Sequence, residues 1–165
     1  MNTEIELMAF ATVETLKSAG LSVATAESCT GGMISAALTE VPGASAVFRY
    51  GWVSYCNEAK ERMLHVPTEI IEAHSPVSEQ VVAAMAESAM RQAGADLAIA
   101  VSGNAGPTAP EGEPPVGTVC LALVRRGAAR PLHTETMQLP GLSRKQFRQR
   151  VTARALELIL GSAKG

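Results

Sequence analysis

A short, almost continuous apolar run at residues 96–101 (DLAIAV) limits the folds open to this chain. It lies between a helical segment and a loop rich in glycine and proline. Such a run is typical of a strand that is covered on both faces. A strand of this kind belongs to a sheet with helices on both sides, so we expect a layered α/β domain.

The rest of the chain supplies elements that suit this architecture. Apolar residues recur at helical spacing in several segments, whereas other short runs are β-leaning and end in turn residues. We predict helices at residues 3–19, 33–41, 57–64, 67–73, 78–93 and 144–160. We predict strands at residues 21–26, 48–55, 96–101, 117–124 and 131–139, the last two forming a hairpin. The expected fold is one three-layer α/β/α domain, residues 1–165, with a mixed, mostly parallel sheet of about five strands.

Composition narrows the classes of function. The 165 residues suit a single domain, and the net charge of -2 comes without a long basic block. Nucleic acid is therefore not expected as a partner, because binding phosphates requires clustered Lys and Arg. No run of 18 apolar residues and no signal peptide is present, so we expect a cytoplasmic protein that does not bind a membrane. The three cysteines are widely spaced and indicate neither disulfides nor a metal site.

The segment around Ser28 is the first candidate site. Residues 26–32 (AESCTGG) lie between a predicted strand and a predicted helix. In an open α/β sheet such turns lie at the carboxyl ends of strands, where ligands bind. The N–H groups of Thr30, Gly31 and Gly32 at the helix start can hold a phosphate or stabilise an oxyanion. The alternative is that Ser28 or Thr30 only caps the helix.

Lys60 is the candidate base for a serine nucleophile. If Asn57 caps the helix that follows, Lys60 lies in its first turn, where the helix dipole disfavours a positive charge. The dipole supplies only a fraction of the required pKa shift, so burial must supply most of it. Tyr55, at the end of the preceding strand, can relay a proton or fix Lys60. A solvated lysine beside a core tyrosine is the alternative.

Two further segments offer groups for a ligand. The loop at 102–117 (SGNAGPTAPEGEPPVG) contains Ser102, Gly103 and Gly106 and can wrap a ligand with its backbone N–H groups. It can equally be a plain surface connection. The last predicted helix begins with Arg144 and Arg148, which share one face and can bind a phosphate or carboxylate. A solvated basic face is the alternative there.

Taken together, these segments resemble the CinA C-terminal domain family, whose characterised members are nicotinamide-nucleotide amidases. The resemblance covers residues 21–160, and its most specific part is TAESCTGG followed by NEAK. The matching stretches are TAESCTGG (25–32), VPGAS (41–45), SYCNEAKERML (54–64), VSEQVVAAMAE (77–87), SGNAGP (102–107), PPVGTV (114–119) and RKQFR (144–148).

The resemblance implies hydrolysis of nicotinamide mononucleotide to nicotinic acid mononucleotide and ammonia, in pyridine-nucleotide salvage, without a cofactor or metal. It implies that Ser28 is the nucleophile, Lys60 the general base and Tyr55 an assisting hydroxyl. The candidate substrate-binding residues are Glu27, Thr30, Gly31, Gly32, Ser102, Gly103, Gly106 and Arg148. Many family members carry an additional N-terminal domain, whereas this chain is similar to the stand-alone form.

The chain departs from the family pattern in the loop. The family usually has Thr and Ile where this chain has Ser102 and Asn104, and a glycine-rich run where it has residues 108–110 (TAP). An acidic residue is usual at Ser143. An amidase for a different small amide is therefore one alternative, and a catalytically silent nucleotide-binding or partner-binding module is another. A purely structural domain ranks third, and apolar helix faces favour a homo-oligomer, a dimer or larger.

Overall fold

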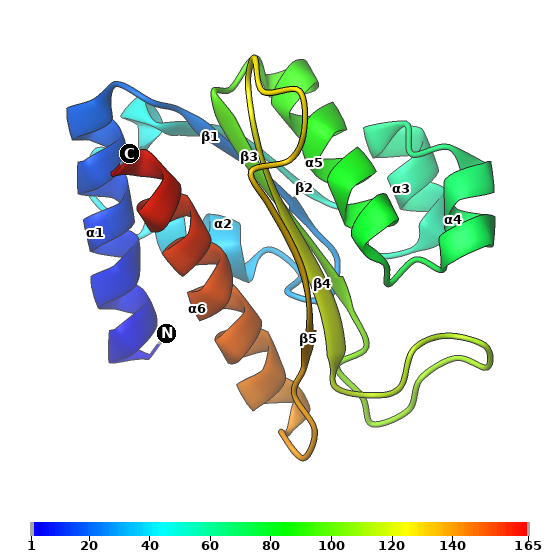
Figure 1. Ribbon diagram of the computed structural model, residues 1–165. Coiled ribbons are helices and arrows are strands. Elements are labelled where there is room, and N and C mark those ends of the chain that lie inside the picture. Colours follow the sequence, from blue (N-terminus) through cyan, green and yellow to red (C-terminus); the bar gives the residue numbers. More distant parts are fainter. Residues whose placement is uncertain (1, 165) are drawn as a thin grey trace.

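A five-stranded sheet lies between two layers of helices in the computed structural model, which describes residues 2–164 (Figure 1). The two end positions of the predicted domain therefore lie outside the described residues. The strands are β1 (Val23–Glu27), β2 (Phe48–Val53), β3 (Leu97–Gly103), β4 (Thr118–Arg125) and β5 (His133–Gln138). The helices are α1 (Thr3–Ala19), α2 (Met33–Thr39), α3 (Asn57–Leu64), α4 (Thr68–His74), α5 (Glu79–Ala93) and α6 (Arg144–Ala163), with a short 3-10 helix at Ala44–Ala46.

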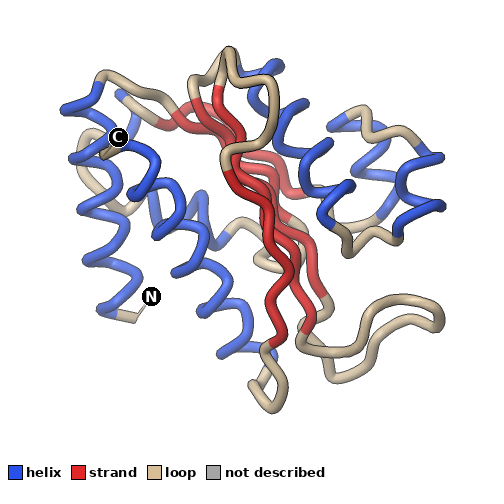
Figure 2. The backbone as a smooth tube through the Cα atoms, viewed as in Figure 1, coloured by secondary structure: helices blue, strands red, loops and turns tan. Residues whose placement is uncertain are grey.

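The sheet has the order β2-β1-β3-β4-β5. Strands β2, β1 and β3 are parallel, β4 is antiparallel to β3, and β5 is antiparallel to β4. Four of the five strands therefore point the same way, and the predicted hairpin is the β4–β5 pair. The predicted mixed sheet in a three-layer α/β/α fold is confirmed. Figure 2 shows α1, α2 and α6 on one side of the sheet and α3, α4 and α5 on the other.

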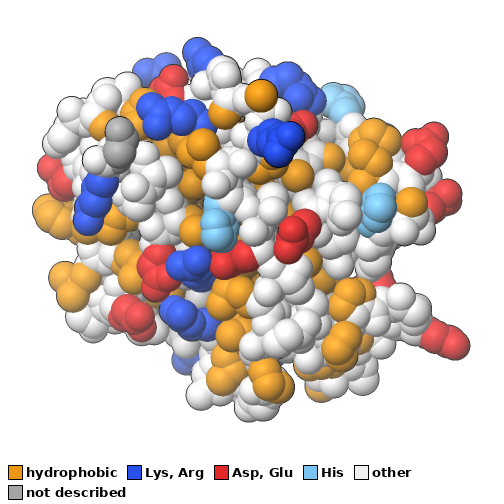
Figure 3. Space-filling model, in the orientation of Figure 1, with side chains coloured by type: hydrophobic (Ala, Val, Ile, Leu, Met, Phe, Trp, Pro, Cys, Tyr) orange, Lys and Arg blue, Asp and Glu red, His pale blue; other side chains and the backbone are white. Residues whose placement is uncertain are grey.

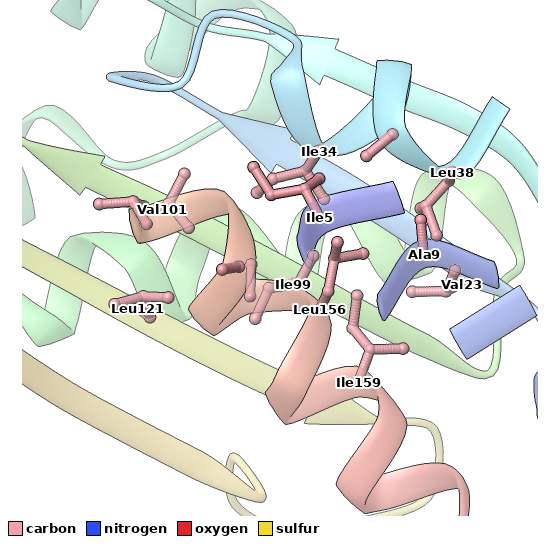
Figure 4. Close-up of a cluster of buried hydrophobic side chains, with 14 of the residues drawn as sticks. Ile5, Ala9, Val23, Ile34, Leu38, Ile99, Val101, Leu121, Leu156 and Ile159 are labelled. Atoms are coloured by element: carbon pink, nitrogen blue, oxygen red, sulfur yellow. The ribbon is translucent and has the colours of Figure 1, made fainter. Parts of the chain in front are cut away.

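The two faces of the sheet carry side chains of different size. Large aliphatic residues of the central strands, such as Ile99, Val101 and Leu121, pack against α1, α2 and α6 (Figure 4). The opposite face presents alanines to α5, as at Ala98 and Ala100. Alternation of large and small residues along β3 follows from the two-residue period of a strand. The small face gives α5 room to lie close to the sheet.

Most element boundaries agree with the prediction to within one or two residues. Helix α2 ends at Thr39 rather than 41, and α6 continues to Ala163 rather than 160. Cys56, not Asn57, is the N-cap of α3, and its side chain makes no capping hydrogen bond. Asn57 is the first helical residue, so the predicted cap was wrong by one position. None of the helices in residues 2–164 combines the length and hydropathy needed to cross a bilayer.

Candidate active site

A pocket of about 380 Å³ opens where the parallel strands end. Ser28 follows β1, Tyr55 follows β2, and Ser102 and Gly103 close β3, so three neighbouring strands deliver these residues to one edge of the sheet. Ligand sites of open α/β sheets lie at this edge. Figure 3 shows the corresponding face hollowed between the α3–α4 helices and the loop that joins β3 to β4. The lining residues are Ser28, Cys29, Tyr55, Cys56, Asn57, Lys60, Pro76, Val77, Ser102, Gly103, Asn104, Ala105, Gly106, Thr108, Pro110, Glu113 and Arg144.

Ser28 and Lys60 meet on the wall of this pocket. Lys60 Nζ lies 3.2 Å from Ser28 Oγ and also donates to the backbone carbonyl of Ser54 at 3.2 Å. Only 2% of Lys60 and 6% of Ser28 are exposed to solvent. The two side chains are 32 positions apart in sequence, and packing of α3 beside the end of β1 brings them together.

Burial lowers the pKa of Lys60, because the charged ammonium loses its hydration. The nearby Cys56, Cys29 and Glu113 oppose this shift, but burial is the larger effect. No acidic side chain forms an ion pair with Lys60 among residues 2–164, so nothing in that range offsets the desolvation fully. A neutral amine at hydrogen-bond distance from a serine hydroxyl is able to accept its proton.

The pKa of Cys29, the residue next to Ser28, is shifted in the opposite direction to that of Lys60. Burial, together with the negative charge of Glu27, raises the pKa of the Cys29 thiol to about 12. A thiol of this kind stays protonated near neutral pH and is a poor nucleophile. Of these two neighbouring side chains, Ser28, which lies 3.2 Å from Lys60 Nζ, is therefore the better candidate nucleophile.

Glu27 determines the shape of the turn that carries Ser28. Its carboxylate is fully buried and accepts hydrogen bonds from the N–H groups of Gly32, Ile34 and Ser35 at 2.8–3.1 Å. It also accepts bonds from the hydroxyls of Thr30, at 2.6 Å, and Ser35, at 2.7 Å. The carboxylate thus closes the N-terminus of α2, where a negative charge is favourable.

Arg148 holds the same turn from the other side. Its Nε donates to the carbonyl of Cys29 at 3.2 Å, and its Nη2 donates to the carbonyl of Thr30 at 2.8 Å. Gly31 has φ of +58°, and a Cβ there would lie 3.3 Å from Arg148 Nη2. Glycine therefore suits both the left-handed backbone and the close approach of the guanidinium group.

The predicted site residues divide into two groups. Ser28, Tyr55, Lys60, Ser102, Gly103 and Gly106 all line the pocket. Five others do not line it and instead build or hold the turn around Ser28: Glu27, Thr30, Gly31, Gly32 and Arg148. The N–H groups of Gly31 and Gly32, expected to face a ligand, donate to the Ser28 carbonyl and to Glu27.

Tyr55 stands at the mouth of the pocket. Its side chain is 58% exposed, and its hydroxyl accepts a hydrogen bond from Arg144 rather than contacting Lys60. Arg144 also donates to the carbonyl of Gly106 at 2.7 Å, and so links α6 to the loop after β3. The sequence had indicated Arg144, with Arg148, as a group able to bind a phosphate or carboxylate at the basic start of the helix.

Two contributions had no clear signal in the sequence. Glu113 lines the pocket from the middle of the long loop, a position that carries no periodicity. The carbonyl of Ser54 accepts a hydrogen bond from Lys60 Nζ. Because every residue has a backbone carbonyl, the identity of residue 54 could not indicate this contact. Within residues 2–164 no group of three His, Cys, Asp or Glu side chains is arranged to hold a metal ion.

Known proteins resemble this chain along most of its length. The family described as the CinA C-terminal domain matches residues 6–162. A CinA-like protein of Akkermansia muciniphila is 51% identical over 140 residues, which cover 85% of this chain and 33% of that protein. A CinA-like protein of Citrifermentans bemidjiense is 55% identical over 115 residues, covering 70% of this chain and 28% of that protein. The chain thus spans about a third of the length of the curated relatives it matches.

Solved structures extend the match to the whole fold. The crystal structure of the competence/damage inducible protein CihA from Agrobacterium tumefaciens has a TM-score of 0.93 at 39% identity, covering 100% of this chain and 98% of that one. A competence-damaged protein (CinA) superfamily structure from Klebsiella pneumoniae has a TM-score of 0.91 at 33% identity, covering 99% of each chain. This chain belongs to the CinA C-terminal domain family.

Proposed function

We propose that this protein is an amidase that hydrolyses the carboxamide of nicotinamide mononucleotide to nicotinate mononucleotide and ammonia, in pyridine-nucleotide salvage. The observation that carries the proposal is the 3.2 Å contact between Ser28 Oγ and the buried amine of Lys60 on a pocket wall. Membership of the CinA C-terminal domain family supports the choice of substrate. No step of the proposed reaction uses a cofactor or a metal.

The reaction begins with transfer of a proton from Ser28 Oγ to neutral Lys60 Nζ. Ser28 Oγ attacks the amide carbon and forms a tetrahedral intermediate. The protonated Lys60 then gives its proton to the leaving nitrogen, the C–N bond breaks, and ammonia departs. Lys60 then deprotonates a water molecule, which attacks the remaining ester, and the protonated Lys60 gives this proton to the departing Ser28 Oγ. One amine therefore serves as base and then as acid in both halves of the cycle.

The geometry keeps Lys60 ready for this role. The Ser54 carbonyl accepts one N–H of the amine, which leaves the nitrogen lone pair of neutral Lys60 available to the Ser28 hydroxyl. For the oxyanion, the N–H of Cys29 is the suitable donor. It belongs to the residue after the nucleophile, and Cys29 lines the pocket.

The remaining site residues either contact the substrate or position the turn that carries Ser28. Ser102, Gly103 and Gly106 line the pocket and contact the substrate directly. Tyr55 assists at the mouth of the pocket through its bond to Arg144, rather than through Lys60. Glu27 and Arg148 are positioning residues, because their contacts fix the backbone of the turn that follows Ser28.

Ammonia release from nicotinamide mononucleotide by the purified protein tests the proposal. We expect turnover by the parent and a loss of at least about 10³-fold in Ser28→Ala and in Lys60→Met. Ser18→Ala and Lys145→Met are matched controls. The Ser18 hydroxyl bonds only to the Glu14 carbonyl on an exposed helix, and Lys145 is exposed and outside the pocket. Both controls should keep parental activity.

The same experiment separates the alternatives. A parent that releases no ammonia while the nucleotide raises its melting temperature would indicate a silent binding module. A parent that is inactive on this nucleotide but cleaves another carboxamide would place the difference in the loop after Gly106. Equal activity of Lys60→Met and the parent would contradict the assignment of the base.

A further inference from the structure

Glu113 is an acidic side chain that the proposed reaction does not use, yet it lines the pocket. It comes from the loop between β3 and β4 and is the only acidic residue among those lining the pocket within residues 2–164. Its side chain is partly buried, and its carboxylate makes no hydrogen bond or ion pair with the described residues. A carboxylate in this situation is free to meet a ligand.

The position of Glu113 is unfavourable for the catalytic base. Its negative charge acts on Lys60 and opposes the lowering of the lysine pKa. It therefore favours the protonated amine, which cannot accept the proton of Ser28. This penalty disappears only when a positive charge beside Glu113 offsets it.

Within residues 2–164 no cationic side chain forms an ion pair with Glu113. Arg144, the other cation on the pocket wall, has its guanidinium group bonded to the Tyr55 hydroxyl and to the Gly106 carbonyl. The nicotinamide ring of the proposed substrate does carry a positive charge, because its nitrogen is bonded to the ribose. That nitrogen lies within one ring width of the amide carbon that Ser28 attacks, and so enters the pocket with it.

We propose that Glu113 recognises the cationic ring of the substrate and selects pyridinium carboxamides over amides borne on neutral rings. The inference rests on the proposed function and adds the residue that distinguishes a cationic ring from a neutral one. Binding of the cation offsets the carboxylate, so the neutral form of Lys60 becomes more favourable in the complex than in the free protein. Binding of the substrate thus favours the form of Lys60 that can accept the proton of Ser28.

Two nucleotides that differ in ring charge provide the test. Nicotinamide mononucleotide has a cationic ring, and its reduced dihydronicotinamide form has a neutral ring with the same carboxamide, ribose and phosphate. Dissociation constants are measured by calorimetry in Ser28→Ala, where turnover is blocked. Adding Glu113→Gln should weaken binding of the cationic form by about tenfold or more, as a partly buried charge pair implies, and change the reduced form less than about twofold.

Matched variants separate charge from structure. Glu111→Gln lies on the same loop, is exposed and does not line the pocket, so it should leave both constants unchanged. Glu113→Lys should reverse the preference and bind the neutral form more tightly. Equal losses for both nucleotides in Glu113→Gln, or no loss for either, would overturn the role of Glu113.

Failure of the inference is distinguishable from failure of the proposed function. If the active parent releases ammonia from nicotinamide mononucleotide but Glu113→Gln keeps the parental charge preference, only the inference is wrong. If the parent neither releases ammonia nor binds either nucleotide, the proposed function fails and the inference fails with it.

Discussion

Replacing Glu27 by glutamine changes one oxygen to an NH₂ group in a carboxylate that accepts five hydrogen bonds. Oε2 accepts from Thr30, Gly32 and Ile34, while Oε1 accepts from the backbone N–H and the hydroxyl of Ser35. Glutamine keeps its single oxygen best at the Oε2 position, where three donors converge. Its NH₂ group then faces the N–H of Ser35, which is a donor as well.

The magnitude follows from these contacts. The unpaired N–H of Ser35 costs about 1–3 kcal/mol, and the three bonds that remain weaken because a charged acceptor becomes neutral. Loss of the negative charge at the start of α2 costs about 0.3–1 kcal/mol more. Removing a buried charge returns part of this total, because the carboxylate no longer has to be desolvated. We expect a net loss of about 2–4 kcal/mol in the free energy of unfolding.

Urea denaturation of the parent and Glu27→Gln measures the effect directly. A loss of that size should lower the melting temperature by roughly 5–15 °C in a domain of this length. Glu58→Gln is the control, since Glu58 likewise places a carboxylate at a helix N-terminus but is 70% exposed and pairs with Arg62. Its unfolding free energy should stay within about 0.5 kcal/mol of the parent. If Glu27→Gln matched this control, the carboxylate would not be what holds the turn.

Four further predictions concern the groups around Ser28. Because burial lowers the pKa of Lys60, kcat/KM should rise with pH and level off below the ordinary lysine pKa. Lys60→Met should raise the unfolding free energy at pH 7, and chemical denaturation should show this gain shrinking toward higher pH, where the unfolded parent also loses its proton. Iodoacetamide followed by mass spectrometry should label exposed Cys56 and spare buried Cys29, and Cys29→Ala should keep activity within about tenfold. Labelling of Cys29 first would contradict its raised pKa. Arg148→Lys keeps the positive charge but cannot make both hydrogen bonds to the carbonyls of Cys29 and Thr30, so kcat should fall while KM changes little. A change in KM alone would return Arg148 to direct substrate binding.

The regular elements could be predicted because each has a periodic signal. Strand β3 alternates large and small apolar residues, and α5 has a serine cap, an apolar stripe and a glycine after its last residue. These signals are local, so they survive without knowledge of the tertiary structure. The end of α6 was predicted too early, because Gly161 is a residue type typical of a helix end, whereas the helix continues through it to the buried Ala163.

The site was predictable only in part, for a physical reason. Ser28 and Lys60 were identified by residue type and by family resemblance, and the sheet places them at one edge. The role of Glu27 was not visible, because a glutamate before a turn has the same sequence signature whether it faces a ligand or caps a helix. Its five donors come from a backbone path that forms only when the turn folds.

The closed start of α2 bears on where the substrate phosphate binds. The N–H groups of Gly32, Ile34 and Ser35 donate hydrogen bonds to the Glu27 carboxylate. A phosphate placed there would therefore meet a negative charge instead of free donors. On the pocket wall Lys60 is the proposed base, so Arg144 is the cation that we expect to bind the phosphate of the proposed substrate.

Arg144 is suited to this task because a guanidinium binds a phosphate through two parallel N–H groups. Its bonds to the Tyr55 hydroxyl and the Gly106 carbonyl use two of the five guanidinium N–H groups, which leaves three for a phosphate. We expect Arg144→Met to raise KM for nicotinamide mononucleotide by at least about tenfold, the loss typical of a charge-assisted hydrogen bond. Turnover of the riboside, which lacks the phosphate, should change less than about twofold, and Lys145→Met should change neither. If Arg144→Met impaired both substrates equally, Arg144 would serve the shape of the pocket, and the phosphate would have to bind elsewhere.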